Sequence, residues 1–372
     1  MSKFSKLCLA SIAVISAASS HAFASDLEIA PMVMNGEPTE LADVPWQVKL
    51  TSIWEDSNYN LKGSLCGGSI VSDSVVLTAA HCFKPPEAGF ALREVRVTYY
   101  SDSNPFGASI ITLQPDKVVG HERWAGEIAN AYDIAYLHDP LNRFAASKKI
   151  KVASASEFDD MWYQFESTYV PNQDNDPNLL TSGYGFDENG ELENLNKVMV
   201  TGLDASSCSS LTGFNGDLSK ETICVKSYDF NYNMSICQGD SGGPLVWQNP
   251  NHSSDEDYGL RLVGITSYVT VDQNDKCMMH FNGYAGYTSI DHYKDWLNDS
   301  VFDKTGMQFD VESINANYEF DINPIDGINI EGGSDKDLTV TVEAKSGGSA
   351  GALSLGGLLL LGASRRRKKG KK

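Results

Sequence analysis

The hexapeptide Gly239-Asp240-Ser241-Gly242-Gly243-Pro244 decides which fold and which chemistry this sequence predicts. Glycines on both sides of Ser241 predict a tight turn, because glycine accepts backbone angles that a side chain forbids. Such a turn presents the serine hydroxyl and directs backbone N–H groups toward one point in front of it. A serine hydroxyl becomes a good nucleophile only when a neighbouring base takes its proton and a third group orients that base.

Two motifs upstream of the serine supply these groups. Ala79-Ala80-His81-Cys82 carries an imidazole, and Tyr132-Asp133-Ile134-Ala135 places one carboxylate among apolar residues. The order histidine, aspartate, serine resembles that of the trypsin/chymotrypsin-like serine proteases, the S1 family. The resemblance implies a serine endopeptidase that forms an acyl-enzyme on protein or peptide substrates. It makes Ser241 the nucleophile, His81 the general base and Asp133 the residue that orients the base.

The strand pattern agrees with the fold of that family. Short alternating stretches at 44–50, 94–99 and 110–113, separated by turn signals, favour an antiparallel all-β structure. The resemblance implies two six-stranded β-barrels with the active site between them. Apolar residues from Ile290 to Leu297 at helical spacing predict a C-terminal helix over 289–301. We therefore expect a protease domain over 33–301 and a small β-module or spacer over 302–345.

The resemblance also implies a substrate pocket. The residue six positions before the nucleophile forms the floor of this pocket in the family, and here it is Ser235. Ser267-Tyr268-Val269 aligns with the strand that binds the substrate backbone, while Val269 and Ala285 stand where many relatives have glycine. A neutral floor and narrowed walls predict cleavage after small or medium apolar side chains.

Backbone groups beside the nucleophile carry two further expectations from the family. The N–H groups of Gly239 and Ser241 are expected to form the oxyanion hole. Val33-Met34-Asn35-Gly36 resembles an activation junction, where cleavage frees the α-amino group of Val33 to pair with buried Asp240. The residue before the cut is Met32, where many relatives carry Arg or Lys, so the activating enzyme stays open.

Cysteine usage fits an oxidising compartment. Cys8 lies in the predicted signal peptide, and the six other cysteines allow fifteen pairings between which spacing does not choose. No pair has the Cys-x-x-Cys spacing favoured by zinc sites, so neither a metal nor another cofactor is expected. The family pairing implied by the resemblance is Cys66–Cys82, Cys208–Cys224 and Cys237–Cys277.

Both ends of the sequence read as processing signals. Lys3 and Lys6, an apolar run and Ala22-Phe23-Ala24 predict a signal peptide over 1–24, removed by signal peptidase, and a propeptide over 25–32. Ser346-Gly347-Gly348-Ser349, a dozen apolar residues and seven bases follow at 346–372. This layout resembles the GlyGly-CTERM sorting tail of secreted Gram-negative proteins.

The tail resemblance implies further partners and a destination. A rhomboid-type intramembrane protease cuts near the glycines after transient membrane association. Type II secretion then exports the product through the periplasm, or the product stays on the cell surface. An uncut membrane anchor is the plain alternative, although a dozen apolar residues is short for a span of about 20.

The charge of the chain excludes one class of function. The sequence has 29 basic and 49 acidic residues, a net charge of −20. Nine of the bases and none of the acids lie in the signal peptide and the tail, so the remaining chain carries −29. So acidic a protein is repelled by nucleic acid and by anionic lipid, and no nucleic-acid role is expected.

Two alternatives to a peptidase remain. A catalytically silent relative would act as a binding or adhesion module, although all three catalytic positions are intact here. An esterase would need its Gly-x-Ser-x-Gly motif before the acid and the histidine, whereas His81 and Asp133 precede Ser241. Reaction with a fluorophosphonate separates the silent relative from the enzyme.

Overall fold

The computed structural model describes residues 33–104, 107–126, 131–185, 195–213, 220–274, 276–313 and 318–328. The predicted signal peptide (1–24), propeptide (25–32) and sorting tail (346–372) lie outside these residues, as does the stretch from 329 to 345. None of the helices in the described ranges is long and apolar enough to cross a membrane.

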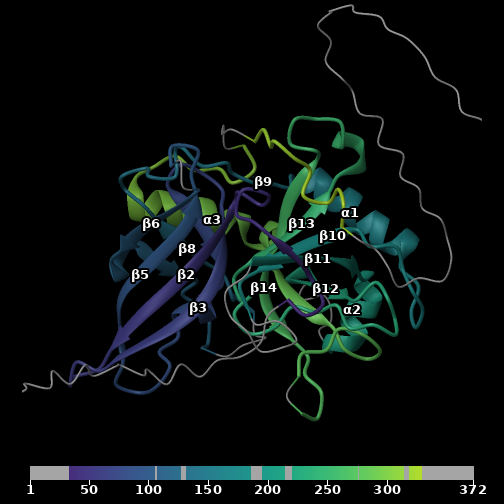
Figure 1. The fold of residues 1–372 in the computed structure, drawn as a ribbon, viewed down its shortest axis with the longest axis horizontal. Helices are drawn as coiled ribbons and strands as arrows, with labels where there is room; N and C mark the ends of the chain where they lie inside the picture. The colour runs from purple at the N-terminus through teal and green to yellow at the C-terminus, as the bar shows by residue number, and fades with distance from the viewer. Residues whose placement is uncertain are drawn as a thin grey trace, which may run out of the picture. The chain divides into compact units, whose positions relative to one another are not determined.

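The first half of the chain forms a curled antiparallel sheet, drawn in purple and blue in Figure 1. Its strand order is β6-β5-β2-β3-β4-β8-β7. Along β2, buried residues alternate with half-exposed ones, so one face of the strand packs on the core as the sequence pattern predicts. The strands are β2 (Gln47–Glu55), β3 (Leu61–Ile70), β4 (Val75–Thr78), β5 (Ala91–Tyr100), β6 (Ala108–Leu113), β7 (Val118–Gly120) and β8 (Ala135–His138).

The second half forms a closed barrel. Six antiparallel strands pair in a ring, β10-β11-β12-β15-β14-β13 and back to β10, while β1 adds to β11 and β9 to β14. These strands are β1 (Glu37–Thr39), β9 (Lys151–Val152), β10 (Leu179–Gly183), β11 (Leu195–Gly202), β12 (Thr222–Lys226), β13 (Pro244–Gln248), β14 (Leu260–Val269) and β15 (Ala285–Ser289).

The expected all-β, chymotrypsin-like architecture is confirmed, with one difference in detail. The second sheet is a closed six-stranded barrel, as expected. The first is a curled half-barrel, because no hydrogen-bonded pairing joins its edge strands β6 and β7 within the described residues.

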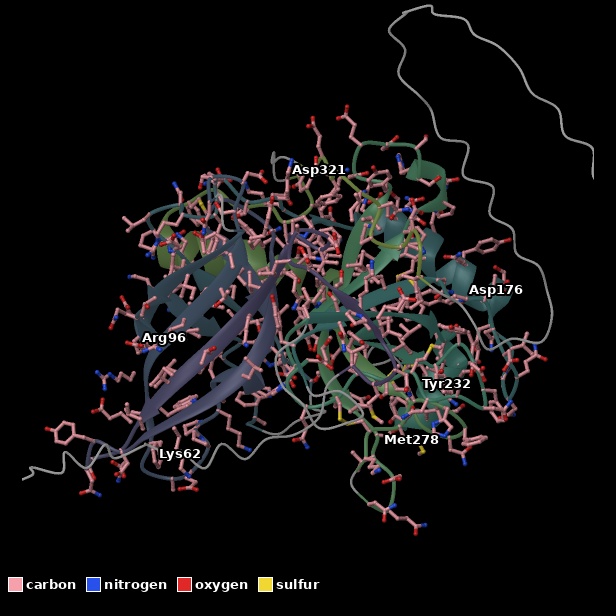
Figure 2. All side chains as sticks on the ribbon, viewed as in Figure 1. Lys62, Arg96, Asp176, Tyr232, Met278 and Asp321 are labelled. Carbon is pink, nitrogen blue, oxygen red and sulfur yellow. A yellow bond between two sulfur atoms is a disulfide. The ribbon has the colours of Figure 1, made fainter. Side chains whose placement is uncertain are left out.

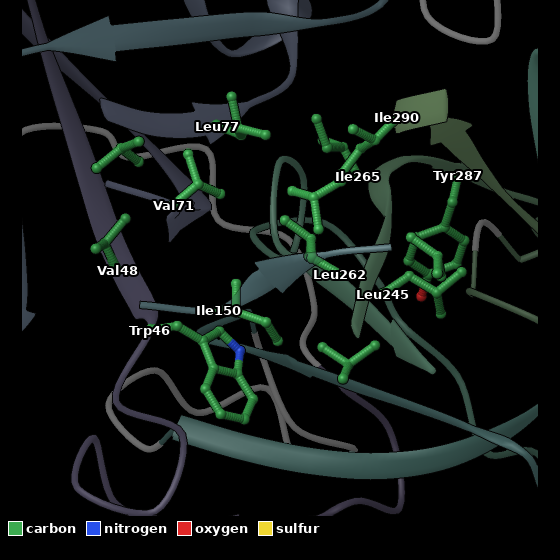
Figure 3. Close-up of a cluster of buried hydrophobic side chains, with 14 of the residues drawn as sticks. Trp46, Val48, Val71, Leu77, Ile150, Leu245, Leu262, Ile265, Tyr287 and Ile290 are labelled. Carbon is green, nitrogen blue, oxygen red and sulfur yellow. The ribbon is translucent and has the colours of Figure 1, made fainter. Parts of the chain in front are cut away.

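A shared hydrophobic core joins the two sheets. Figure 3 shows Trp46, Val48 and Val71 from the first half facing Leu262 and Ile265 of β14, and all five are buried. Full burial of a large aliphatic side chain contributes about 1.5–3 kcal/mol. This packing therefore holds the ends of both sheets, which carry the three catalytic motifs, in one arrangement.

Within the described residues three α-helices lie outside the sheets, and the last is the one predicted from the sequence. α3 (Ile290–Thr305) ends at Gly306, whose φ of +70° suits glycine, and it runs four residues beyond the prediction. The other two, α1 (Ala155–Thr168) and α2 (Ala205–Thr212), were not predicted from the sequence. α1 begins with a capping box between Ser154 and Glu157, and Asp204 caps α2.

The chain continues past α3 as a segment that we call the strap, residues 306–313 and 318–328. The described part of the strap contains no strand. Phe320 stacks edge-on against Trp46, which precedes β2, with ring centroids 4.8 Å apart. The buried ammonium of Lys197, on β11, donates to the Pro324 carbonyl at 2.8 Å. The strap therefore contacts both the half-barrel and the closed barrel.

Candidate active site

Two segments of the half-barrel bring a histidine and an aspartate together. His81 lies in a single 3₁₀ turn, η1 (Ala80–Phe83), and Asp133 precedes β8. The His81 Nδ1 atom is 2.8 Å from Asp133 Oδ2, and the His81 backbone N–H donates to Oδ1 at 2.9 Å. Because the carboxylate accepts the proton on Nδ1, Nε2 is left as the basic nitrogen.

Two residues of the closed barrel complete the contacts of Asp133. The Ser267 hydroxyl donates to Asp133 Oδ2 at 2.5 Å, and Thr288 Oγ1 donates to the Asp133 carbonyl at 2.9 Å. The sequence analysis assigned Ser267 to substrate binding and missed both of these contacts. Ser267 is buried, and buried hydroxyls need a partner.

The turn around the nucleophile requires its glycines. Gly239 has a φ of +98°, and an added Cβ there would lie 2.7 Å from the Gly185 Cα. Gly242 has a φ of +77°, and an added Cβ would lie 2.2 Å from Thr78 Oγ1. These positive angles confine both positions to glycine.

Hydrogen bonds on both sides of Ser241 set the direction of this turn. The Gly67 N–H donates to the Ser241 carbonyl at 2.7 Å, and the Gly242 N–H donates to the Thr266 carbonyl at 2.8 Å. By contrast, neither the Gly239 nor the Ser241 N–H donates to another backbone carbonyl of the described chain. Among the described residues, the two N–H groups expected to form the oxyanion hole therefore have no backbone acceptor.

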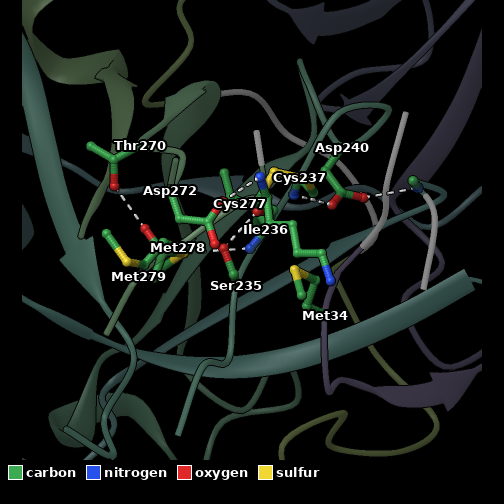
Figure 4. The surroundings of a disulfide bond; sticks show 12 residues. Met34, Ser235, Ile236, Cys237, Asp240, Thr270, Asp272, Cys277, Met278 and Met279 are labelled. Carbon is green, nitrogen blue, oxygen red and sulfur yellow. Dashed lines mark hydrogen bonds between the residues drawn. A yellow bond between two sulfur atoms is a disulfide. The ribbon is translucent and has the colours of Figure 1, made fainter. Parts of the chain in front are cut away.

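Asp240 is fully buried beside the nucleophile. Its carboxylate accepts the Cys237 N–H at 2.9 Å and the Gly185 N–H at 3.0 Å, drawn as dashed lines in Figure 4. Burial raises the pKa of Asp240 to about 7, against the two N–H groups, which lower it. Gly183 leaves room for this carboxylate, since an added Cβ there would lie 1.9 Å from Oδ1.

The start of the described chain lies next to the same loop. Val33 is buried, and Met34 pairs with Ser235. The Met34 N–H donates to the Ser235 carbonyl at 2.6 Å, and the Ser235 N–H donates back at 3.2 Å. The expected activation junction and the expected pocket floor are therefore neighbours.

The expected pocket residues lie on the segment before the nucleophile and on two paired strands. The Ser235 side chain is buried, and its hydroxyl donates to the Ile236 carbonyl at 2.7 Å. Val269 faces Ala285 directly across β14 and β15. The Tyr268 ring lies against Gly286, where an added Cβ would come within 2.2 Å of the ring.

One residue near the floor was missed. Met279 is fully buried, and its sulfur accepts the Ile236 N–H at 3.4 Å. Figure 4 shows Met279 with Ser235 and Ile236 around the Cys237–Cys277 disulfide. Its position two residues after Cys277 was the only sequence signal.

The structure contains the three disulfides implied by the resemblance. Cys66–Cys82 links β3 to the turn that carries His81, and the others are Cys208–Cys224 and Cys237–Cys277. Cys66, Cys82 and His81 offer ligand atoms within 4.8 Å of one another. Because the two sulfurs are bonded to each other, they do not act as thiolate ligands for a metal.

Comparisons with known proteins agree with this geometry. Residues 33–297 match the Trypsin family. The chain is 30% identical over 258 residues to Trypsin iota of Drosophila melanogaster, covering 68% of this chain and 84% of that protein. It is 28% identical over 299 residues to Lectizyme of Glossina austeni, covering 79% of this chain and 94% of that protein. It also resembles the solved structure of HL collagenase, with a TM-score of 0.49 and 19% identity, covering 74% of this chain and 100% of that one. The chain therefore belongs to the trypsin family of serine endopeptidases.

Proposed function

We propose that this endopeptidase is an exported enzyme, made as a zymogen, that cleaves polypeptides after small or medium apolar residues. The observations that support the specificity are the buried, uncharged Ser235 and the pairing of Val269 with Ala285 across two strands. The Ser235 hydroxyl already donates to a carbonyl and offers no charge. A Lys or Arg side chain entering there would lose water without gaining an ion pair, which is costly for a buried charge.

The proposed reaction rests on the Asp133–His81 hydrogen bonds and on the roles that the triad residues take in the family. His81 Nε2 takes the Ser241 proton while Ser241 Oγ attacks the scissile carbonyl carbon. The carbonyl oxygen becomes negative and binds the Gly239 and Ser241 N–H groups, each worth on the order of 100- to 1,000-fold in rate. His81 then protonates the leaving amine, and water releases the acyl group by the same steps.

During both steps Asp133 holds the imidazole. The His81 Nδ1–H donates to a carboxylate that also accepts from Ser267 and from the His81 backbone N–H. Three donors fix the carboxylate in one orientation, so the imidazole keeps Nε2 toward the nucleophile.

The proposed activation rests on the charge of Asp240. The described residues within 4.0 Å of this buried carboxylate include no cationic side chain, and a buried charge is stable only when paired. Cleavage after Met32 would free the Val33 ammonium as the missing counter-charge. Buried Val33 and the pairing of Met34 with Ser235 support this. The apolar side chain of Met32 fits the proposed pocket. We therefore also propose that this enzyme itself, or another protease with the same preference, cuts after Met32.

Export and sorting are proposed from the ends of the sequence. Signal peptidase removes 1–24, a rhomboid-type protease cuts the tail near Gly347-Gly348, and type II secretion releases the enzyme from a Gram-negative cell or leaves it on the surface. The net charge of −29 in the remaining chain suits a soluble protein outside the cell.

A peptide-library profile of the purified enzyme tests the proposed function. We expect Ala, Val, Leu or Met before the cut, with Ser241→Ala reducing turnover on the order of 10⁵- to 10⁶-fold at unchanged thermal stability. A profile dominated by Lys or Arg contradicts the pocket assignment.

The likeness to Lectizyme favours the alternative of a catalytically silent binding module. Labelling by a fluorophosphonate decides between the two. Ser241-dependent labelling supports the peptidase. A folded protein that neither reacts nor cleaves any library peptide supports the binding module.

A further inference from the structure

The residue before the catalytic aspartate has an unusual backbone conformation. Tyr132 has a φ of +70°, in the left-handed region that bulky side chains rarely adopt. Such a conformation is energetically unfavourable and persists only where surrounding contacts enforce it. The contacts around Tyr132 therefore show what this strain achieves.

Side chains from two distant segments hold the Tyr132 ring. The ring centroid is 4.7 Å from that of His121, and the Arg123 guanidinium carbon lies 4.2 Å from it. Tyr293, on α3, contributes its ring at 5.8 Å, and its hydroxyl accepts the Tyr132 backbone N–H at 2.7 Å. His121 in turn stacks on Trp296 of α3 at 4.6 Å.

Hydrogen bonds fix the backbone on the other side of Tyr132. The Ile134 N–H donates to the Tyr132 carbonyl at 2.8 Å, which closes a three-residue turn with Asp133 at its centre. The His121 N–H donates to the Ile134 carbonyl at 3.0 Å, and Thr288 Oγ1 holds the carbonyl of Asp133. A turn this tight aims the side chain of its central residue.

We propose that Tyr132 is a positioning residue for catalysis. Its left-handed backbone, imposed by the Tyr293 hydroxyl and by the packed ring, directs the Asp133 carboxylate at His81. A residue at position 132 that does not adopt this conformation would turn the Asp133 carboxylate away from His81 Nδ1. The inference rests on the proposed role of Asp133 in the triad.

Two substitutions at one position separate backbone conformation from simple loss of the ring. Both Tyr132→Val and Tyr132→Asn remove the ring, but asparagine tolerates the left-handed region and valine does not. We expect Tyr132→Val to lower kcat about 100-fold, as a misplaced catalytic group does, with KM nearly unchanged. Tyr132→Asn should keep kcat within a few-fold of the wild type.

A tyrosine outside the site provides the matched control. Tyr59, in the turn between β2 and β3, has a φ of +66° and is 82% exposed. Tyr59→Val should strain its turn in the same way but leave kcat unchanged. If Tyr132→Val does not fold, Tyr293→Phe removes only the hydroxyl that accepts the Tyr132 N–H, and we expect it to lower kcat about tenfold.

Three results would overturn the inference: wild-type kcat in Tyr132→Val, equal losses in Tyr132→Asn and Tyr132→Val, or wild-type kcat in Tyr293→Phe. Asp133→Asn, measured in parallel, tests the triad itself and should lose on the order of 10⁴-fold in kcat. An active Asp133→Asn enzyme would refute the triad. An inactive one beside an unaffected Tyr132→Val would refute the positioning role alone.

Discussion

Asp240 illustrates how much the protonation of a single residue matters in this protein. Burial raises the pKa of Asp240 in the folded chain to about 7, well above its ordinary value of 3.8. The folded chain therefore binds a proton that the unfolded chain releases, and the contribution of Asp240 to stability falls as pH rises from about 4 to about 7. The Val33 ammonium would reverse this by pairing with the charged form.

The uncut protein should carry this signature. In a Ser241→Ala background that retains Met32, we expect the free energy of unfolding to fall between pH 4 and pH 8, relative to the Asp240→Asn derivative. The difference should reach about 4 kcal/mol at most. Urea unfolding across this pH range measures it, and parallel curves for the two proteins would contradict it. After cleavage at Val33 the sign of this pH dependence should reverse, because the ammonium stabilises the charged carboxylate.

Val269 should limit the size of the substrate side chain, because it faces Ala285 where the two strands pair. Val269→Gly removes three carbon atoms from this wall. We expect kcat/KM for Phe or Tyr before the cut to rise about tenfold or more relative to Ala, since each methylene changes discrimination by about 10- to 200-fold. Thr270→Ser, one residue further on, serves as a control. An unchanged ratio in Val269→Gly would place the wall elsewhere.

At the scale of elements, the strap extends the protease core beyond α3. Phe309, Val311 and Phe320 are buried, and the Val311 N–H donates to Asn298 Oδ1 on α3 at 2.9 Å. The Phe320 N–H donates to the Glu256 carbonyl at 3.1 Å, in the loop between β13 and β14. The strap thus buries apolar side chains, and its backbone N–H groups donate to acceptors on separate elements. Both kinds of contact stabilise a packed segment.

Phe320→Ala tests this packing, because it removes the ring that contacts Trp46. We expect a loss of about 3 kcal/mol in the free energy of unfolding, typical for deletion of a buried phenylalanine ring. The neighbouring Asp321 is exposed, as Figure 2 shows, and Asp321→Ala should change stability by less than about 0.5 kcal/mol. Urea denaturation compares the two, and equal stabilities would show that the strap does not support the core.

For the whole molecule, we predict that the chain is cut at both ends before the enzyme acts. We predict that the mature enzyme begins at Val33 and lacks Arg365 to Lys372, because the apolar run is short for a permanent span. Intact mass of secreted or surface material measures both ends. The Ser241→Ala protein, expressed without related proteases, should retain 25–32. Basic residues found in the mature protein would refute tail removal, and normal cutting of Ser241→Ala would refute self-activation.

The sequence by itself determined the features that depend on local spacing. Glycines at 239 and 242 predict the nucleophile turn because both positions take a positive φ, which glycine accepts and other residues avoid. The atoms that a Cβ would meet there belong to Gly185 and Thr78, which lie far away in the sequence. The apolar period of α3 lies within one segment. The disulfide pairs came only through the resemblance to a family, since six cysteines do not specify their own pairing.

Only the tertiary structure decided the contacts between distant segments. Ser267 and Asp133 are 134 residues apart, and Trp46 and Phe320 lie near opposite ends of the described chain. The left-handed backbone of Tyr132 could not be predicted from the sequence either, because tyrosine avoids that region unless packing enforces it. Spacing along a chain encodes the period of a helix or strand, whereas these contacts depend on how the half-barrel, the closed barrel and the strap pack together.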